Sequence, residues 1–423
     1  MTIYIFTAAD RNYLPKVRLL AESIKRFHPS IVFVLAFVDK LPSKALPEGA
    51  WDEVLLAEDL HIEKWHAWAF AHCVVELATA IKPFALINLL NRPGCTQVFY
   101  FDPDTVAYSP LDDLLHFERQ ESIKLTPHQV EPNIYWQDVA DNEISSLRHG
   151  AYNLGFIGVN NTAVGVRFAA WWAQMLFWFC RDDISSGLFT DQKWADLVPS
   201  LFPEVVIVRN PRFNVAPWNI NNRIISLSEN GQYLVNGMPL GFYHFTGFDR
   251  GAHRMVIMKH QAENKALLGM IEWYEESIKE SAALPSDRWL YGIYSNGQNI
   301  LDIHRLVYRY SPELQHRFPN PFECGTKAAS GYFGWINSRR RRSLQRIVEE
   351  RRDLYRYRPT IATDNMAQAN VDNAELVLVA IGQKGGWRLL LRHATSAYKR
   401  DGSRSFLRKL AGRSEERRVG KEC

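Results

Sequence analysis

The sequence lacks both a charged leader and a long hydrophobic run. Its N-terminus, MTIYIFTAADRN, has neither the positive region nor the apolar stretch of a secretory signal. Its most apolar segment, residues 168–180, reads FAAWWAQMLFWFC and is shorter than the roughly 20 residues that cross a bilayer. We therefore expect this segment to form a buried helix and the protein to reside in the cytoplasm.

Cysteines are few, and none has a partner at a characteristic spacing. The chain has five, an odd number, without a C-x-x-C pattern; this favours reduced thiols in a cytosol. His61, His66, His72 and Cys73 are close in sequence, but they lack the ligand spacing of a zinc site. We expect these histidines on a helix surface or in the core, with zinc binding as the alternative.

A strong net charge and a dinucleotide fingerprint are also absent. The net charge of +4 is too small to indicate nucleic acid as the main partner. No G-x-G-x-x-G follows the first expected strand, which disfavours a dinucleotide-binding fold. A chain of 423 residues with 47% hydrophobic and 23% charged residues is neither disordered nor fibrous. It predicts one large domain with an appendage, or two domains.

Strand and helix patterns alternate over residues 1–252. Residues 2–7 and 31–38 are short apolar runs, and the second is continuously apolar, as in a parallel strand covered on both faces. A helix between them is predicted by apolar residues spaced three or four apart: Val17, Leu20, Ile24 and Phe27. This order is a β–α–β unit and predicts an α/β fold with a mixed, mainly parallel, Rossmann-like sheet flanked by helices.

The rest of this region continues the alternation. Two further helices are expected, over residues 163–180 and over residues 70–91, where Pro83 should kink the helix or split it in two. The other expected strands are residues 97–101, 122–126, 156–159, 205–208 and 241–245.

The pattern changes after residue 252. Residues 253–345 predict a helical, aromatic-rich appendage, and residues 346–412 a charged linker with the start of a second α/β domain, beginning with a strand at 376–381. The four arginines at 339–342 open a charged helix, which is either a solvated face or a patch for peripheral contact with the inner face of a membrane. Residues 413–423 (RSEERRVGKEC) resemble a translated sequencing adapter; we expect them to be an artefact and the second domain to be cut off there.

Two carboxylates, Asp102 and Asp104, directly follow the strand expected at 97–101. Ligands bind at the carboxyl edge of open α/β sheets. Residues two apart on a strand point to the same side, so both carboxylates can reach one cation. Hard oxygen ligands suit Mg²⁺ or Mn²⁺, which can bridge to a diphosphate. By itself the D-x-D pattern is also typical of a turn or a cap.

Four further motifs accompany this one, and together they resemble a known family. In chain order the five are TAAD at 7–10, D-P-D at 102–104, N-L-G-F at 153–156, D-Q at 191–192 and H-F-T-G at 244–247. Their order resembles the retaining GT-A glycosyltransferases of family 8, which include glycogenin and bacterial lipopolysaccharide galactosyl- and glucosyltransferases. The resemblance spans about residues 1–250.

The resemblance implies a role for each matching residue. Asp102, Asp104 and His244 would ligate Mn²⁺ (or Mg²⁺), and Lys82 would approach the diphosphate or the donor sugar. Asp191 and Gln192 would be the catalytic residues beside sugar and acceptor. The remaining residues would contact the donor. Thr7, Ala8, Asp10 and Asn12 would line the nucleoside pocket, Asn153 and Gly155 would border the donor sugar, and Gly247 would lie against the phosphates. The family's Lys-Pro-Trp after H-x-x-G is missing, so Arg250 would take over the phosphate contact.

The implied function is transfer of a hexose from a UDP-sugar to a glycan or lipid-linked acceptor, in cell-surface polysaccharide synthesis. Retention would follow from attack on the same face as the leaving group, with Asp191 orienting sugar hydroxyls. A sugar-phosphate nucleotidyltransferase and a glycan-binding module on the same fold are the alternatives. Two local roles are also open, since each segment is either part of the sugar site or packing: the strand end Thr126-Pro127-His128, and a loop with Asn214, Trp218 and Asn219.

Overall fold

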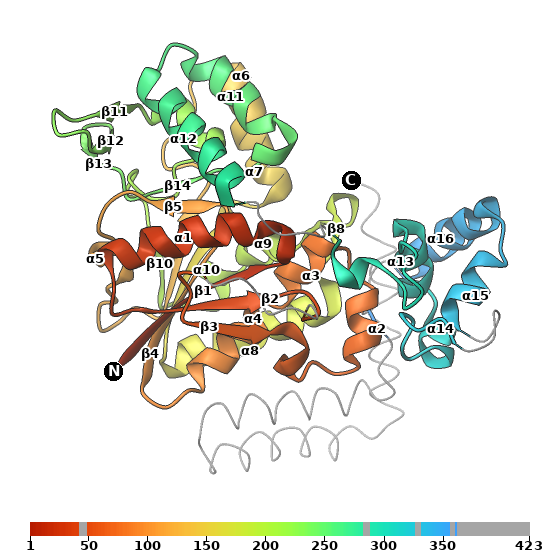
Figure 1. The fold of residues 1–423 in the computed structure, drawn as a ribbon. Helices are drawn as coiled ribbons and strands as arrows, with labels where there is room; N and C mark the ends of the chain where they lie inside the picture. Colours follow the sequence, from red (N-terminus) through yellow and green to blue (C-terminus); the bar gives the residue numbers. More distant parts are fainter. Residues whose placement is uncertain (42–48, 282–287, 326–330, 356–359, 362–423) are drawn as a thin grey trace, which may run out of the picture. The chain divides into compact units, whose positions relative to one another are not determined.

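A computed structural model describes residues 1–41, 49–281, 288–325, 331–355 and 360–361, all within one compact unit (Figure 1). The strand expected at 376–381 and the tail at 413–423 lie outside the described residues. The four described cysteines, Cys73, Cys95, Cys180 and Cys324, are free thiols.

A seven-stranded sheet forms the centre, in the order β10-β6-β7-β4-β1-β2-β3. Strand β7 runs antiparallel to both its neighbours, β4 and β6, and the other neighbouring pairs are parallel. The expected mixed, mainly parallel sheet is therefore confirmed. The strands are β1 Thr2–Ala9, β2 Val32–Phe37, β3 Glu53–Leu56, β4 Cys95–Phe101, β6 Ile123–Pro127, β7 Tyr152–Asn160 and β10 Val205–Ile207.

Both faces of this sheet are buried, because alternate residues of each strand enter different cores. On one face Tyr4, Phe6 and Ala8 of β1 pack with the helices α3, α4 and α8. On the other face Ile5 and Ala9 pack against α1. Figure 1 shows α1 on one side of the sheet and α4 with α8 on the other. The helices are α1 Leu14–Phe27, α3 Val74–Ala80, α4 Lys82–Leu90 and α8 Ala163–Phe179.

The predicted split of the long helix at Pro83 is confirmed. Helix α3 ends at Ala80, and Pro83 lies in the first turn of α4, where its missing N–H has no intrahelical partner to lose. The segment before it forms a separate short helix, α2 Trp65–Phe70. No helix in the described part of the chain is long and apolar enough to span a membrane.

Short elements beside the sheet complete the site region. Strand β5 Thr105–Ala107 pairs antiparallel with β14 Phe242–His244. A third core joins β5 and β14 to the small sheet β11–β13 and to the two long helices α11 and α12. These elements are β11 Ile225–Leu227, β12 Tyr233–Val235, β13 Met238–Pro239, α11 Ala252–Gln261 and α12 Lys265–Ser281. Further short elements are α5 Asp112–Leu115, α6 Trp136–Asp138, α7 Ile144–His149, β8 Asp182–Asp183, β9 Leu188–Phe189, α9 Gln192–Ala195 and α10 Val198–Leu201.

The aromatic-rich segment near the C-terminal end packs around Phe70. Its ring contacts the rings of Tyr294, Tyr308, Phe322 and Tyr332 at centroid distances of 5.1–5.9 Å. The helices here are α13 Asp302–Arg309, α14 Pro312–Arg317, α15 Tyr332–Asn337 and α16 Arg341–Tyr355. The arginines at 339–342 are exposed at the start of α16. This exposure is compatible with both expected roles, a solvated helix face and a patch for membrane contact. The domain limits at 252 and 345 stay predictions.

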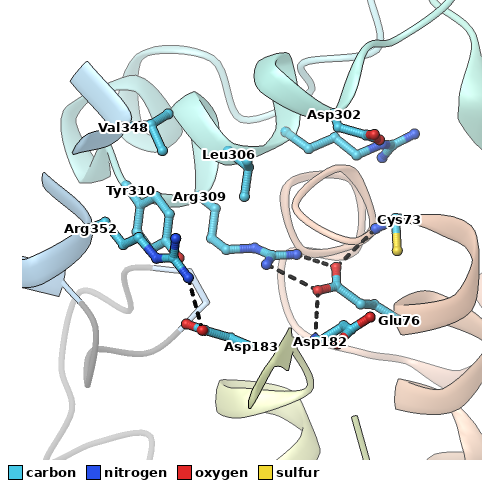
Figure 2. Close-up of a pocket in the computed structure, with 11 residues that line it drawn as sticks. Cys73, Glu76, Asp182, Asp183, Asp302, Leu306, Arg309, Tyr310, Val348 and Arg352 are labelled. Atoms are coloured by element: carbon cyan, nitrogen blue, oxygen red, sulfur yellow. Dashed lines mark hydrogen bonds and ion pairs between the residues drawn. The ribbon is translucent and has the colours of Figure 1, made fainter. Parts of the chain in front are cut away.

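A buried ion pair lies between α13 and α3. Arg309 forms hydrogen-bonded contacts with both carboxylate oxygens of Glu76, and its Nε donates to the carbonyl of Ala71 at 2.8 Å. These side chains line a cavity of about 280 Å³ (Figure 2). Burial alone would raise the pKa of Glu76, but the adjacent guanidinium outweighs it and lowers the pKa to about 2.

Removing one partner of this pair should destabilise the fold. Glu76→Gln leaves Arg309 buried without a counter-charge, so we expect a loss of about 3 to 5 kcal/mol in the free energy of unfolding at pH 7. Glu22→Gln, which breaks an exposed pair with Arg18, is the control and should cost less than about 1 kcal/mol.

The stability that the Glu76–Arg309 pair contributes should decrease as the pH falls. The folded pKa of Glu76 is depressed, so the pair's contribution is present above pH 4.5 and is lost as the pH falls toward 2. Urea unfolding of the unaltered chain and of Glu76→Gln should therefore give curves that converge over this range. An equal gap at pH 7 and at pH 3 would contradict the account.

Candidate functional site

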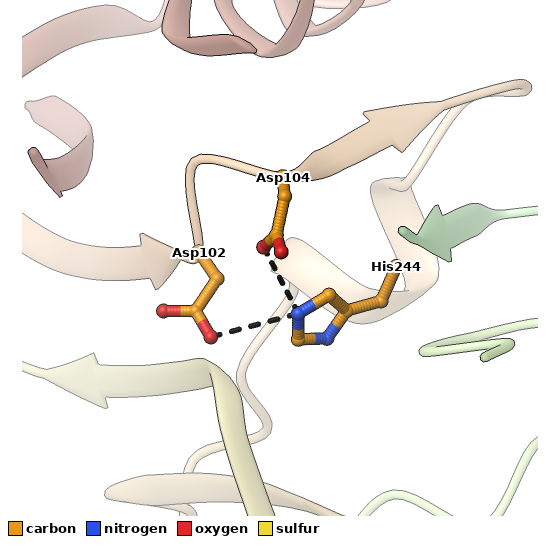
Figure 3. A group of neighbouring side chains, drawn as sticks. All are labelled: Asp102, Asp104 and His244. Atoms are coloured by element: carbon orange, nitrogen blue, oxygen red, sulfur yellow. Dashed lines mark ion pairs between the residues drawn. The ribbon is translucent and has the colours of Figure 1, made fainter. Parts of the chain in front are cut away.

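Three side chains from distant parts of the chain meet at the carboxyl edge of the sheet. Asp102 follows β4, Asp104 precedes β5, and His244 ends β14 (Figure 3). The register of β5 and β14 places His244 opposite Thr105. As a result His244 Nε2 lies 3.0 Å from Asp104 Oδ1 and 3.7 Å from Asp102 Oδ2. The three predicted metal ligands are thus brought together.

Their atoms have the spacing of a cation site. One ligand atom from each residue lies within 4.8 Å of the others, and the part of the chain that the structure describes contains no other group of three such residues. Two carboxylates and one imidazole suit Mn²⁺, which accepts oxygen and nitrogen ligands. The His61, His66, His72 and Cys73 alternative has no such geometry, and His72 Nδ1 instead contacts the carbonyl of Trp68 at 2.7 Å.

The electrostatics of this cluster favour a positive charge at its centre. Burial alone would lower the pKa of His244, but the carboxylates of Asp104 and Asp102 outweigh it and raise the pKa. Burial likewise opposes the ionised form of Asp104, and His244 and Lys16 nevertheless lower the pKa of that carboxyl. A divalent cation would compete with the proton for Nε2 of His244.

Asn214 fixes the orientation of His244. Its side-chain oxygen lies 3.2 Å from His244 Nδ1, and its amide nitrogen donates to Thr126 Oγ1 and to Asn153 Oδ1, both at 2.9 Å. With the amide nitrogen occupied as a donor, the oxygen accepts the proton of Nδ1. The lone pair of the ring is then on Nε2, facing Asp102 and Asp104.

The same chain of amides continues to Gln192. Asn153 Nδ2 donates to Gln192 Oε1 at 3.2 Å, and Gln192 Nε2 donates to the carbonyl of His149 at 3.1 Å. Each amide thereby has one orientation, from His244 through Asn214 and Asn153 to Gln192. The two predicted residues Asn153 and Gln192 therefore lie in one hydrogen-bonded row that ends on a predicted metal ligand.

Gly155 leaves the space that His244 fills. A Cβ at this position would lie 2.4 Å from His244 Cε1 and 2.6 Å from Asn153 Oδ1, closer than packed atoms approach. Its carbonyl also accepts a hydrogen bond from the N–H of Asp102 at 2.9 Å. Beyond bordering a sugar, as the motif implies, this glycine holds the metal ligands in place.

Lys82 joins the carboxylate pair to Asp191. Its Nζ lies 3.3 Å from Asp102 Oδ1 and 3.0 Å from Asp191 Oδ2. Burial opposes its charge, but both carboxylates together raise the pKa of Lys82. Burial raises the pKa of Asp191, and Lys82 only partly offsets that effect.

The sequence analysis missed Tyr100, whose hydroxyl donates to Asp102 Oδ1 at 2.5 Å. Its position two residues before Asp102 predicts that both side chains lie on the same side of the strand.

The residues expected around a nucleoside lie at the end of the neighbouring strand. Thr7 and Ala8 are buried in β1, which is parallel to β4, so both strands end at the same edge. Asp10 accepts hydrogen bonds from the backbone N–H and the amide of Asn12, at 3.2 and 2.9 Å. Burial raises the pKa of Asp10. No described residue is a hydrogen-bond partner of the buried hydroxyl of Thr7. Their nucleoside role stays a prediction.

The H-x-x-G motif ends in an exposed turn. Gly247 has φ of 71°, a left-handed conformation that favours glycine. The short helix 248–250 follows it, and Arg250 there is exposed. The phosphate contact predicted for Arg250 stays a prediction.

The two segments with open roles border the metal ligands. The ring of Trp218 lies edge-on to those of both His244 and His128, at centroid distances of 5.2 Å. His128 is buried, which lowers its pKa to about 4, and Asn219 donates to its carbonyl at 3.3 Å. Packing accounts for His128 and Asn219, whereas Trp218 contacts the ring of His244, one of the predicted metal ligands.

Asn214 would not touch the metal itself, but removing its side chain should still weaken metal binding because it holds His244 in place. Asn214 has φ of 52°, so Asn214→Gly deletes the amide without backbone strain. We expect the affinity for Mn²⁺ to fall roughly tenfold in calorimetric titration, since partners behind a ligating histidine typically matter by that amount.

The matched control is Asn236→Gly, an exposed asparagine with φ of 49° in a turn away from the site. It should leave the Mn²⁺ affinity unchanged. If Asn214→Gly binds Mn²⁺ as tightly as this control, Asn214 does not position His244.

Comparisons with known proteins do not establish a family for this chain. No family model matches the chain. In Bacillus subtilis strain 168, the uncharacterized protein YfnF is 27% identical over 204 residues, which cover 48% of this chain and 67% of that protein. YfnD from the same strain is 26% identical over 261 residues, covering 58% of this chain and 78% of that protein.

Three solved structures to which the chain has a low similarity are glycosyltransferases. Galactosyltransferase LgtC, in complex with donor and acceptor sugar analogs, is 16% identical with a TM-score of 0.40, covering 68% of this chain and 98% of that one. A glycosyltransferase involved in the glycosylation of the major capsid of PBCV-1 is 12% identical with a TM-score of 0.35. The match covers 61% of this chain and 100% of that one. Mouse xyloside xylosyltransferase 1 is 13% identical with a TM-score of 0.34, and the match covers 58% of this chain and 98% of that one.

Proposed function

We propose that this chain is a metal-dependent GT-A glycosyltransferase that transfers a hexose from a nucleotide-diphosphate sugar, with a UDP-sugar as the donor. The observation that carries the proposal is the meeting of Asp102, Asp104 and His244 within 4.8 Å at the carboxyl edge of the sheet. Ligands of open α/β sheets bind at this edge. The TAAD segment at the end of the adjacent strand supplies a place for the nucleoside beside the cation.

The donor set fits Mn²⁺ or Mg²⁺. Asp102 and Asp104 offer oxygen, and Asn214 holds His244 with its Nε2 lone pair toward them. When bound, the cation stabilises the negative charge of the departing nucleoside diphosphate. The buried ammonium of Lys82 holds Asp102 and Asp191 in fixed positions on either side of it.

For a retaining transfer, the side chains expected beside the sugar favour attack on the face of the leaving group over a covalent intermediate. Gln192 is a poor nucleophile, and its oxygen is already engaged by Asn153. Asp191 is held against Lys82, so it orients sugar hydroxyls rather than attacking carbon. We therefore propose that the acceptor hydroxyl attacks on the face from which the diphosphate leaves. The acceptor is a glycan or a lipid-linked glycan of cell-surface polysaccharide synthesis.

Loss of either kind of metal ligand should have the same effect. We expect Asp104→Asn and His244→Ala each to lower Mn²⁺-dependent release of UDP from the best UDP-sugar by more than about 100-fold, since the cation supplies several kcal/mol of charge stabilisation. Asp113→Asn, an exposed carboxylate paired with Arg212, is the control and should retain full activity.

The identity of the released product separates the alternatives. A nucleotidyltransferase would release pyrophosphate from a nucleoside triphosphate, and a glycan-binding module would release neither product. If the unaltered chain releases no nucleoside diphosphate from any of a panel of nucleotide sugars with Mn²⁺, the proposed function is wrong.

Asp191→Asn tests the step at the sugar. The carboxylate is proposed to act in the transition state and not in donor binding, so kcat should fall by about 100-fold while the donor KM stays within a factor of a few. Asp196→Asn, at the other end of the same short helix, is the control. Full transfer activity of Asp191→Asn would remove this role.

A further inference from the structure

A second buried lysine faces the site from helix α1. The side chain of Lys16 is 5% exposed, and its Nζ lies 2.6 Å from Asp249 Oδ2. Asp249 belongs to the exposed turn that follows the H-x-x-G motif, and its side chain is 54% exposed. A desolvated ammonium is thus held by a carboxylate that remains in contact with solvent.

Lys16 lies between the expected nucleoside residues and the expected metal ligands. Its Nζ is 4.2 Å from the centre of the Tyr13 ring, and the Tyr13 hydroxyl donates to Asp249 at 3.3 Å. Tyr13 closes the short turn that Asp10 caps. Toward the other side, the charge of Lys16 contributes to the lowered pKa of Asp104. Lys16 therefore neighbours the turn expected to hold the nucleoside and acts electrostatically on an expected metal ligand, the two sites that a donor diphosphate would join.

Apart from the exposed Arg250, whose phosphate contact stays a prediction, the charges of the site described above leave the diphosphate in need of another cation. Asp102 and Asp104 balance a divalent ion, and Lys82 is already paired with Asp102 and Asp191. Among the residues that the structure describes, Asp249 is the one carboxylate within ion-pair distance of Lys16, and its side chain is 54% exposed. An ammonium is a compact point charge suited to phosphate oxygens. The carboxylate of Asp249 therefore occupies the position that a phosphate oxygen would take.

The turn that carries Asp249 is bracketed by glycines. Gly247 and Gly251 have φ of 71° and 70°, and no side chain at Gly251 would meet a neighbouring atom. Within the turn Phe248 stays packed against Tyr274, with ring centroids 5.1 Å apart. The half-exposed side chain of Asp249 can therefore rotate away from Lys16 while the turn keeps its place.

Building on the proposed function, we propose that Lys16 is a phosphate-binding residue of the donor site and that Asp249 is an internal anion which the donor diphosphate displaces from it. In the free protein Asp249 keeps the buried ammonium paired. On binding, the nucleoside diphosphate takes over the ammonium, and the side chain of Asp249 turns to solvent. Asp249 thereby lowers the affinity for the donor, whereas Lys16 raises it.

The two partners should consequently have opposite effects on ligand affinity. We expect Asp249→Asn to bind UDP about fivefold more tightly in calorimetric titration with saturating Mn²⁺, because removing an exposed competing charge is worth up to about 1 kcal/mol. Lys16→Met should bind UDP more than about tenfold more weakly, as expected for loss of a charged hydrogen bond. Thermal unfolding and circular dichroism verify that each variant is folded.

A double mutant separates competition for Lys16 from general repulsion. In the Lys16→Met background, Asp249→Asn should give no gain in UDP affinity, because nothing remains to be released. Glu22→Gln removes an equal charge from an exposed position on α1 and should leave the affinity unchanged.

The outcomes are distinguishable from failure of the proposed function. Weaker UDP binding by Asp249→Asn would mean that Asp249 positions Lys16 for the ligand, and the same gain in both backgrounds would mean simple repulsion; either result overturns this inference alone. If the unaltered chain binds no nucleoside diphosphate with Mn²⁺, the proposed function fails, and the inference fails with it.

Discussion

The pairing of β5 with β14 is the constraint on which the site depends. It joins a strand that begins one residue after Asp104 to a strand that ends on His244, although 140 positions separate these two residues in the sequence. Without this pairing, Asp102 and Asp104 would be two carboxylates at a strand end, with no third ligand. The third core, which includes Val106, Tyr243 and Phe245, stabilises the pairing from behind. The packing of α11 and α12 against this core therefore supports the candidate metal site.

Hydrogen bonds and ion pairs then fix the orientation of the side chains in the site. The amide row from Gln192 to Asn214 ends on the imidazole of His244, and Lys82 connects Asp102 to Asp191. Both links are buried, where an unmatched donor or charge is costly. The residues predicted to face the sugar and those predicted to hold the metal are thus joined by one polar network. The Lys16–Asp249 pair differs because one of its partners is solvent-exposed, which is why it can exchange partners.

Local sequence patterns predicted the sheet and the two carboxylates, whereas His244 was expected as a ligand only through the family resemblance. The apolar runs of β1 and β2, the split at Pro83 and the carboxylates after β4 follow from periodicity and strand ends. The contacts made by Asn214 and Lys16 depend on which loops meet in space, and periodicity carries no information on that. Gly155 was found through its motif, but its clash distance to His244 could only come from the fold.

The most direct test of the account is electron spin-echo spectroscopy of Mn²⁺ bound to the protein with UDP. The account predicts nitrogen coupling from a directly coordinated imidazole in the unaltered chain, and loss of that coupling in His244→Ala. Mn²⁺ that shows no nitrogen coupling in the unaltered chain, or keeps it in the variant, would contradict the three-ligand site.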